Sequence, residues 1–186
     1  PYFFRERVHY DLLANQLFPE LLEKKKNVAG RIKILSAGCS SGEEPYSIAM
    51  TLVEKYGLDI LSSVSIIGCD INQNVIEKAR LGIYGKHSFR GVSDSMRQKY
   101  FTPIEGRQQY EIADPIKNAV TFQSANLLGE VYPELLRDID IIFYRNVSIY
   151  FKADIQARIF KKLSGILNEN GCIFTSATET FLHDVG

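Results

Sequence analysis

The chain has 186 residues, 45% of them hydrophobic, so it can bury one sizeable core and is expected to form one domain with a small appendage. Its 22 basic and 22 acidic residues give a formal net charge of +0. Such a chain has no global field that attracts nucleic acid or anionic lipid, so nucleic-acid partners are disfavoured. No apolar run approaches the ~18 residues of a membrane-spanning helix, and no signal peptide is visible.

Strands and helices alternate along most of the chain. Residues 10–26 have leucines at helical spacing and end in three lysines. Further elements are predicted as strands at 32–35, 64–69, 120–123, 139–144 and 172–176 and as helices at 43–56, 72–80 and 153–167. This alternation predicts an α/β fold with a mostly parallel sheet and helices on both faces.

The pattern changes between residues 93 and 119. A short helix at 93–99 precedes a stretch in which Pro103 and Gly106 flank a turn, and we interpret this stretch as a small antiparallel β-hairpin inserted into the main domain. Because the chain starts without a methionine and stops soon after a predicted strand, we expect it to be part of a longer protein.

The three cysteines, Cys39, Cys69 and Cys172, form no Cys-x-x-Cys pair and lie in or beside apolar stretches. We interpret them as reduced core residues rather than as metal ligands or disulfide partners. This interpretation predicts a cytoplasmic protein without a metal site.

The strand at 32–35 leads through Gly38, Ser40, Ser41 and Gly42 into a helix start. The glycines remove side chains where backbone must approach a ligand, and the serines stand where helix-start amides need acceptors. Asp70, at the tip of the next strand, is placed to hold two ribose hydroxyls. Together these features predict a nucleotide-type pocket.

The glycine spacing argues against a dinucleotide. The G-x-G-x-x-G fingerprint is absent, and Glu43 and Glu44 at the helix start would repel a pyrophosphate. Acids there suit a ligand with a sulfonium, an ammonium and ribose hydroxyls, which describes S-adenosylmethionine (SAM). Both acids could instead complement the helix dipole, which we take as the better interpretation for Glu44.

Four polar or glycine positions follow directly on strands, namely Gly38, Asp70, Asn126 and Arg145. Because ligands of such sheets lie outside the carboxyl ends of the strands, we expect these residues around one crevice. Asp70 could instead cap the next helix and Arg145 could be a structural ion-pair partner. We favour ribose binding for Asp70, since a glycine turn precedes it, and a functional role for Arg145, since it lies just past a strand.

Four ordered motifs resemble the CheR family of chemotaxis-receptor methyltransferases, which use SAM to methyl-esterify receptor glutamates. They are SAGCSSGEEPYSIA at 36–49, Asp70-Ile71-Asn72 followed by EKARLGIY at 77–84, Asn126-Leu127-Leu128, and YRNVSIYF at 144–151. The resemblance runs from Phe3 to about Glu179. It implies a Rossmann-like class I SAM-dependent methyltransferase fold and a monomeric cytoplasmic enzyme that yields S-adenosylhomocysteine.

The resemblance also implies roles for individual residues. The positions that hold the cofactor are Ala37, Gly38, Glu43, Asp70, Asn126 and Leu127, with Asp70 on the ribose and Asn126 and Leu127 beside the adenine. Arg5, Arg145 and Tyr150 line the methyl-transfer end.

By the same resemblance, residues 1–30 form an N-terminal helical segment and substrate-side lid on a SAM-binding domain over residues 31–186. The small β-subdomain at about 93–119 resembles one that, in some members, docks on a peptide at the receptor tail. The implied partner is the cytoplasmic helical domain of chemoreceptors. The family's N-terminal helical domain and final strands are absent from this chain, and Pro1 and Ser41 stand where the family often has threonine.

Methylation of a glutamate needs no general base, because its carboxyl group, with a reference pKa of ~4.3, is already ionised at neutral pH. We therefore assign no role to the three histidines. Aligning oxygen, methyl carbon and sulfur can supply about 7 to 11 kcal/mol of the barrier. We expect Arg5 or Arg145 to grip the non-attacking oxygen or the cofactor's carboxylate, and Tyr150 to offer an orienting hydrogen bond.

Other functions fit less well. N-methylation usually accompanies an Asn or Asp followed by Pro-Pro-aromatic after the fourth strand, but this chain has Arg145-Asn146-Val147-Ser148. No cysteine suits cytosine C5 methylation, and the NAD fingerprint is missing. The alternative that stays open is a regulatory module that binds SAM or S-adenosylhomocysteine without turnover.

Overall fold

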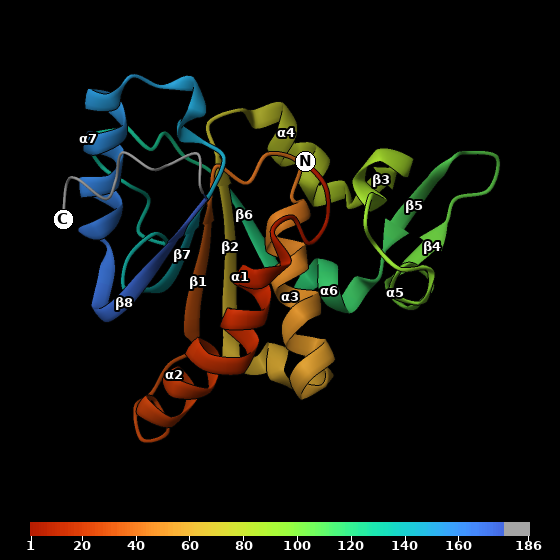
Figure 1. Cartoon of the computed structure of the whole chain (residues 1–186), viewed down its shortest axis with the longest axis horizontal. Coiled ribbons are helices and arrows are strands. Elements are labelled where there is room, and N and C mark those ends of the chain that lie inside the picture. The colour runs from red at the N-terminus through yellow and green to blue at the C-terminus, as the bar shows by residue number, and fades with distance from the viewer. Residues whose placement is uncertain (177–186) are drawn as a thin grey trace.

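The centre of the computed structural model, which describes residues 1–176, is a five-stranded sheet whose neighbouring strands all run parallel (Figure 1). The strand order is β6-β2-β1-β7-β8. The strands are β1 (Ile32–Ala37), β2 (Val64–Asp70), β6 (Val120–Ser124), β7 (Ile139–Tyr144) and β8 (Leu167–Thr175). The predicted α/β class is confirmed. Residues 177–186, which the predicted domain included, lie outside the described residues.

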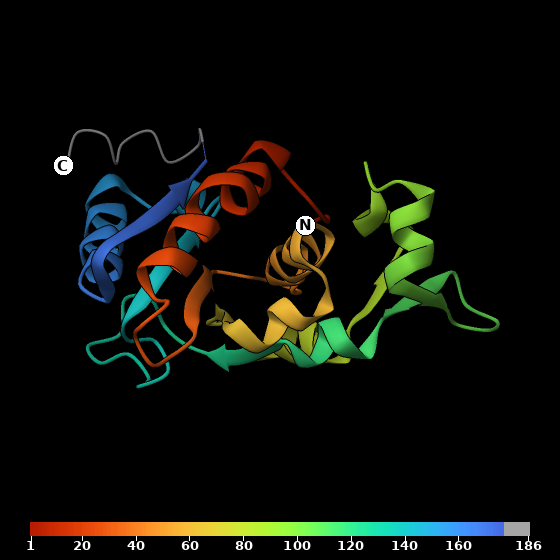
Figure 2. The ribbon, with the colours of Figure 1, turned by 90° about the horizontal axis from the view of Figure 1, so that it is seen from below.

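Helices cover both faces of this sheet (Figures 1 and 2). They are α1 (Arg7–Leu12), α2 (Phe18–Lys24), α3 (Glu43–Tyr56) and α4 (Gln73–Leu81) on one face and α7 (Ala153–Ser164) on the other. Successive strand residues point to opposite faces, so Ile34 packs in one core cluster with Tyr46 of α3, whereas Leu35 packs in the other with Ile159 of α7. Burial on both faces explains the nearly continuous apolar runs of the strands.

The strand order reverses at β1, which pairs with β2 on one side and with β7 on the other. In a doubly wound sheet, such a reversal opens a crevice outside the carboxyl ends of the strands. The loops after β1 and β7 also touch there, because a Cβ on Gly38 would lie 2.6 Å from Val147 Cγ2. The fold therefore brings two of the predicted motifs to one edge of the sheet.

The N-terminal helical segment begins earlier than predicted and is not one regular helix. Between α1 and α2, residues Leu13–Leu17 form a π-helix. Pro19, near the start of α2, has no N–H, and its ring would clash in a regular helix with the carbonyl of Asn15, four residues before it. The wider π turn relieves this clash.

The inserted hairpin is confirmed and belongs to a three-stranded antiparallel sheet of order β3-β5-β4. The strands are β3 (Ile83–Gly85), β4 (Phe101–Pro103) and β5 (Gln109–Ile112), and helix α5 (Asp94–Tyr100) leads into β4. β3 was not predicted from the sequence, because three residues are too few to show alternation. This small sheet lies at the end of the molecule opposite α7 (Figure 1).

The predicted helix at 153–167 is too long. α7 ends at Ser164, the amide of Gly165 closes its last turn on the carbonyls of Lys161 and Lys162, and β8 begins at Leu167. Leu167 pairs with Ile139 of β7, and the amide of Ile139 donates to the carbonyl of Ile166. Residue Leu167, which the spacing of apolar residues assigned to the helix, therefore belongs to the sheet.

The remaining elements are short. They are η2 (Leu58–Ser63), η3 (Lys86–Phe89), α6 (Asp114–Asn118) and η4 (Ser148–Tyr150). Within residues 1–176, no helix is long and apolar enough to cross a membrane.

Candidate active site

A crevice of about 410 Å³ opens at the carboxyl ends of β1, β2 and β7, and the N-terminal residues close one of its sides. Six of the predicted site residues line it, namely Arg5, Gly38, Glu43, Asp70, Arg145 and Tyr150. Ala37, Asn126 and Leu127 are not among its lining residues. The structure therefore brings the predicted methyl-transfer residues to the same crevice as Gly38, Glu43 and Asp70.

The loop after β1 has backbone angles that residues with a Cβ atom rarely adopt. Gly38, Ser40 and Gly42 have φ values of +75°, +49° and +91°. A Cβ on Gly42 would lie 2.9 Å from Ala79 Cβ of α4. The glycines thus meet two demands, a left-handed backbone and close packing against neighbouring elements.

Asp70 joins two loops at the edge of the crevice. Its Oδ2 accepts a hydrogen bond from the amide of Ser40 at 2.9 Å, and its Oδ1 accepts one from the amide of Asn72 at 3.0 Å. The N-cap of α4 is Asn72, whose side chain accepts from the amide of Asn74. The capping role that was the alternative for Asp70 belongs to Asn72, and the Asp70 carboxylate keeps lone pairs that can face the crevice.

Glu43 is only 3% exposed, and hydroxyl groups hold both of its carboxylate oxygens. Its Oε1 accepts from Ser88 Oγ at 2.9 Å, and its Oε2 accepts from Ser41 Oγ at 2.7 Å. Ser88 comes from η3, so this carboxylate connects the crevice to the segment that links β3 of the small sheet to α5. No local pattern around Ser88 indicated this contact, because Glu43 lies 45 positions away in the chain.

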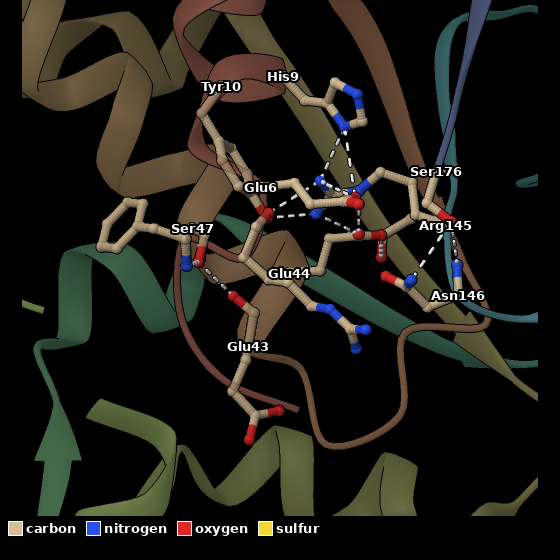
Figure 3. A network of polar contacts seen from close by, with 12 residues as sticks. Glu6, His9, Tyr10, Glu43, Glu44, Ser47, Arg145, Asn146 and Ser176 are labelled. Atoms are coloured by element: carbon tan, nitrogen blue, oxygen red, sulfur yellow. Dashed lines mark hydrogen bonds and ion pairs between the residues drawn. The ribbon is translucent and has the colours of Figure 1, made fainter. Parts of the chain in front are cut away.

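Arg145, which is buried, forms an ion pair with Glu44, which is partly buried (Figure 3). Glu44 Oε2 accepts from Arg145 Nε at 2.9 Å and lies 2.8 Å from Nη2, while its Oε1 accepts from Ser36 Oγ at 2.7 Å. Arg145 is 5% exposed, and burial lowers its pKa less than Glu44 and the other nearby groups raise it. The helix-dipole interpretation of Glu44 therefore omitted its main partner, a residue 101 positions away.

The other donors of Arg145 reach the N-terminal segment (Figure 3). Nη1 donates to the carbonyl of Arg5 at 2.9 Å and lies 2.9 Å from His9 Nδ1, and Nη2 donates to Tyr10 Oη at 2.9 Å. Every nitrogen of the guanidinium thus has a protein partner. The ion-pair alternative for Arg145 describes this arrangement. His9, for which no role was predicted, belongs to it.

The contact between His9 and Arg145 predicts a pH dependence. Nδ1 must be unprotonated to accept from Arg145; burial and the Arg145 charge lower the pKa of His9, and Glu6 raises it in part. Because the pKa of His9 is lower in the folded than in the unfolded protein, its neutral form contributes to stability. This contribution is complete above the unfolded-state pKa of ~6.5 and is lost as the pH falls toward the folded-state pKa. We expect urea unfolding to show a larger loss of stability between about pH 8 and 5.5 for the wild type than for His9→Gln, which keeps an acceptor but does not titrate. Equal losses in the two proteins would contradict this role.

The remaining predicted residues differ in exposure. Arg5 lies with its guanidinium carbon 5.7 Å from the centre of the Tyr2 ring, and Tyr150 is 83% exposed at the rim of the crevice. Asn126 follows β6 and is exposed, and its Oδ1 accepts from the amide of Leu128. The amide of Ala125 donates to the carbonyl of Asp70, so Asn126 lies close to Asp70 in the fold but outside the crevice.

Residues 1–185 match the family model described as "CheR methyltransferase, SAM binding domain". The chain belongs to this family. It is 34% identical over 179 residues to a probable chemotaxis protein methyltransferase of Rhizobium etli, 35% identical over 181 residues to a chemotaxis protein methyltransferase of Borreliella burgdorferi, and 37% identical over 180 residues to chemotaxis protein methyltransferase 1 of Vibrio cholerae. These matches cover 95% to 96% of this chain and 66%, 63% and 63% of those proteins. The chain thus spans just under two thirds of the length of these CheR relatives.

The crevice fits the cofactor that the family description states. Its volume lies within the ~300 to 1,000 Å³ of small-molecule sites. Its lining includes the carboxylates of Glu43 and Asp70, which suit the sulfonium and ammonium charges of SAM, and Asp70 can also accept from ribose hydroxyls. SAM is therefore the cofactor of this CheR domain. No group of acidic, histidine and cysteine residues that could hold a metal ion occurs within residues 1–176.

Proposed function

We propose that this chain is the catalytic part of a protein-glutamate O-methyltransferase. It converts side-chain carboxylates of glutamates on chemotaxis receptors to methyl esters and releases S-adenosylhomocysteine. The observation that carries this proposal is that Arg5, Asp70 and Tyr150, from distant parts of the sequence, line one crevice in a member of the CheR family. The names of its relatives, which are chemotaxis protein methyltransferases, support the same substrate class.

We assign the cofactor to the inner part of the crevice. Asp70 holds the ribose, Gly38 and Ala37 supply backbone beside it, and Glu43 contributes negative charge. Asn126 and Leu127 lie beside the adenine in this proposal, which requires them to approach the crevice when SAM is bound. The bound cofactor supplies a methyl group activated by a sulfonium.

The substrate carboxylate needs orientation more than activation, because it is already ionised at neutral pH. Arg5 holds its non-attacking oxygen, and Tyr150 offers an orienting hydrogen bond from the rim. Arg145 is a poorer candidate for this contact than Arg5, since protein groups already engage each of its guanidinium nitrogens. We therefore place Arg145 among the residues that position the site.

The partners follow from the substrate. We propose that the domain acts as a monomer in the cytoplasm on the helical cytoplasmic domain of chemoreceptors, without nucleic acid and without insertion into the membrane. The small sheet of β3, β4 and β5 offers a surface for a receptor tail peptide. Three free cysteines support a reducing compartment.

Transfer of labelled methyl groups from SAM to receptor-rich membranes tests this proposal. We expect label that mild base releases as methanol, because a carboxyl methyl ester hydrolyses under conditions that leave N-methyl groups intact. Base-stable label would contradict glutamate methylation. Measurable SAM binding without label, with the full-length protein, would favour the regulatory module instead.

A further inference from the structure

The backbone around Arg5 has an unusual conformation. Phe4 and Glu6, the residues on either side of Arg5, have φ values of +55° and +56°. Residues other than glycine rarely adopt this left-handed region, and such positions persist only where the surrounding structure holds them. The direction in which Arg5 enters the crevice is therefore imposed by contacts elsewhere.

Three hydrogen bonds fix this segment to the main domain. The amide of Phe3 donates to the carbonyl of Ser88 at 2.9 Å, and the amide of Phe4 donates to Ser47 Oγ at 3.0 Å. The carbonyl of Arg5 itself accepts from Arg145 Nη1 at 2.9 Å. Of the three, only the bond from Arg145 holds the peptide unit that directly follows the Arg5 side chain.

The position of Arg145 depends in turn on Glu44. The Arg145 side chain is 1% exposed, and Glu44, at the start of α3, approaches both Nε and Nη2 with one carboxylate oxygen. Ser36 Oγ holds the other oxygen of Glu44. The second carboxylate near this guanidinium, Glu6 Oε2, lies 3.5 Å from Nη1. Without Glu44, Arg145 would keep only this longer charged contact, and we expect its side chain to shift or to recruit water.

We propose that Glu44 is a positioning residue of the methyl-transfer site. It contacts Arg145 (Figure 3), and Arg145 in turn holds the Arg5 backbone over the crevice. Glu44 and Arg145 join the ends of three parts of the chain, namely the start of α3, the end of β7 and the segment that carries Arg5. This role rests on the proposed function of Arg5. It predicts that Glu44 sets the rate of transfer and affects SAM affinity little.

The chain offers a matched control at the opposite end of β7. Asp140 is 2% exposed and forms a partly buried ion pair with Lys25 Nζ at 2.7 Å, so Asp140→Asn removes the same kind of charge far from the crevice. Comparing Glu44→Gln with Asp140→Asn separates loss of positioning from general loss of stability.

The first readout does not depend on activity. In native-state hydrogen exchange, we expect the amides of Phe3 and Phe4 to exchange faster in Glu44→Gln than in Asp140→Asn, measured relative to the amides of β1 in each protein. Equal relative protection of the N-terminal segment in the two variants would show that Glu44 does not hold it, and would overturn the proposal.

The second readout is a double-mutant cycle in methyl transfer. We expect Glu44→Gln to lower kcat about 10²-fold with the Kd for SAM changed less than about threefold, since small misplacements of a positioning group have effects of this size. If Glu44 acts through Arg5, adding Glu44→Gln to Arg5→Ala should cost little more than Arg5→Ala alone. Fully additive losses would overturn the proposal.

Two further comparisons keep the test decisive. If Glu44→Gln does not fold, Glu44→Asp can replace it, because the shorter side chain keeps the charge but withdraws it from Arg145. Amide exchange of Phe3 and Phe4 and a kcat equal to those of the wild type in Glu44→Asp would overturn the proposal. If Arg5→Ala keeps full activity, the proposed function of Arg5 fails. Faster exchange of Phe3 and Phe4 in Glu44→Gln would then still support the hold on the segment, so the two failures are distinguishable.

Discussion

Arg5→Ala is expected to lower kcat for methyl transfer by about 10²- to 10³-fold, the loss that follows removal of one preorganised donor from an active site. The Kd for SAM, measured by calorimetry, should change less than about threefold. The physical reason is that Arg5 lines the crevice and, within residues 1–176, forms no ion pair. Its charge is therefore available to orient a carboxylate.

Arg7→Ala is the matched control for this prediction. Arg7 is exposed, two residues further along, and donates to the carbonyl of Gly91 rather than facing the crevice. It should keep near-normal kcat. Equal loss of SAM binding and turnover in Arg5→Ala would contradict the proposed role and assign Arg5 to the cofactor.

Asp70→Ala is expected to weaken SAM binding by about 10²-fold, because two hydrogen bonds from ribose hydroxyls to a carboxylate contribute about 1.5 kcal/mol or more each. The measurement is again the Kd for SAM by calorimetry. Asp70 also accepts from the amides of Ser40 and Asn72, so part of the effect arises from the loop after β1.

Asn72→Ala separates the two contributions. It removes the N-cap of α4 beside Asp70, which costs about 1 kcal/mol of stability, and leaves the carboxylate in the crevice. We expect it to lower the melting temperature with little change in SAM affinity. Normal affinity in Asp70→Ala would refute the ribose role.

Local signals in the sequence were sufficient for most of the fold. α3 begins at Glu43 and ends at Tyr56 as predicted, because acidic residues open the helix and Gly57 closes it. Asn72 caps α4 and Gly82 ends it in the left-handed region, so the helix at Gln73–Leu81 differs by one residue at each end from the predicted 72–80. These boundaries depend on residues within one turn of each other, so a single sequence contains the information.

The predicted secondary structure was wrong where strand pairing in the tertiary structure overrides the local sequence preference. Residues 165–167 were assigned to a helix by their spacing, but the pairing of Ile139 with Leu167 places the start of β8 there. The strand β3 exists because it pairs with β5, some 25 residues later in the chain, and three residues carry no periodic signal of their own.

Local patterns in the amino-acid sequence were enough to predict the class of fold, the glycine loop, Asp70 at the tip of β2 and the family. The partners of the buried charges, in contrast, depend on how the chain folds. Glu44 and Arg145 are separated by 101 positions, and Arg145 and His9 by 136. No spacing rule links residues so far apart, because their contact depends on the reversal of strand order at β1 and on the fold of the N-terminal segment across the crevice. The roles of Glu44 and His9 therefore emerge from the folded chain, in which burial of Arg145 requires a carboxylate and further acceptors around it.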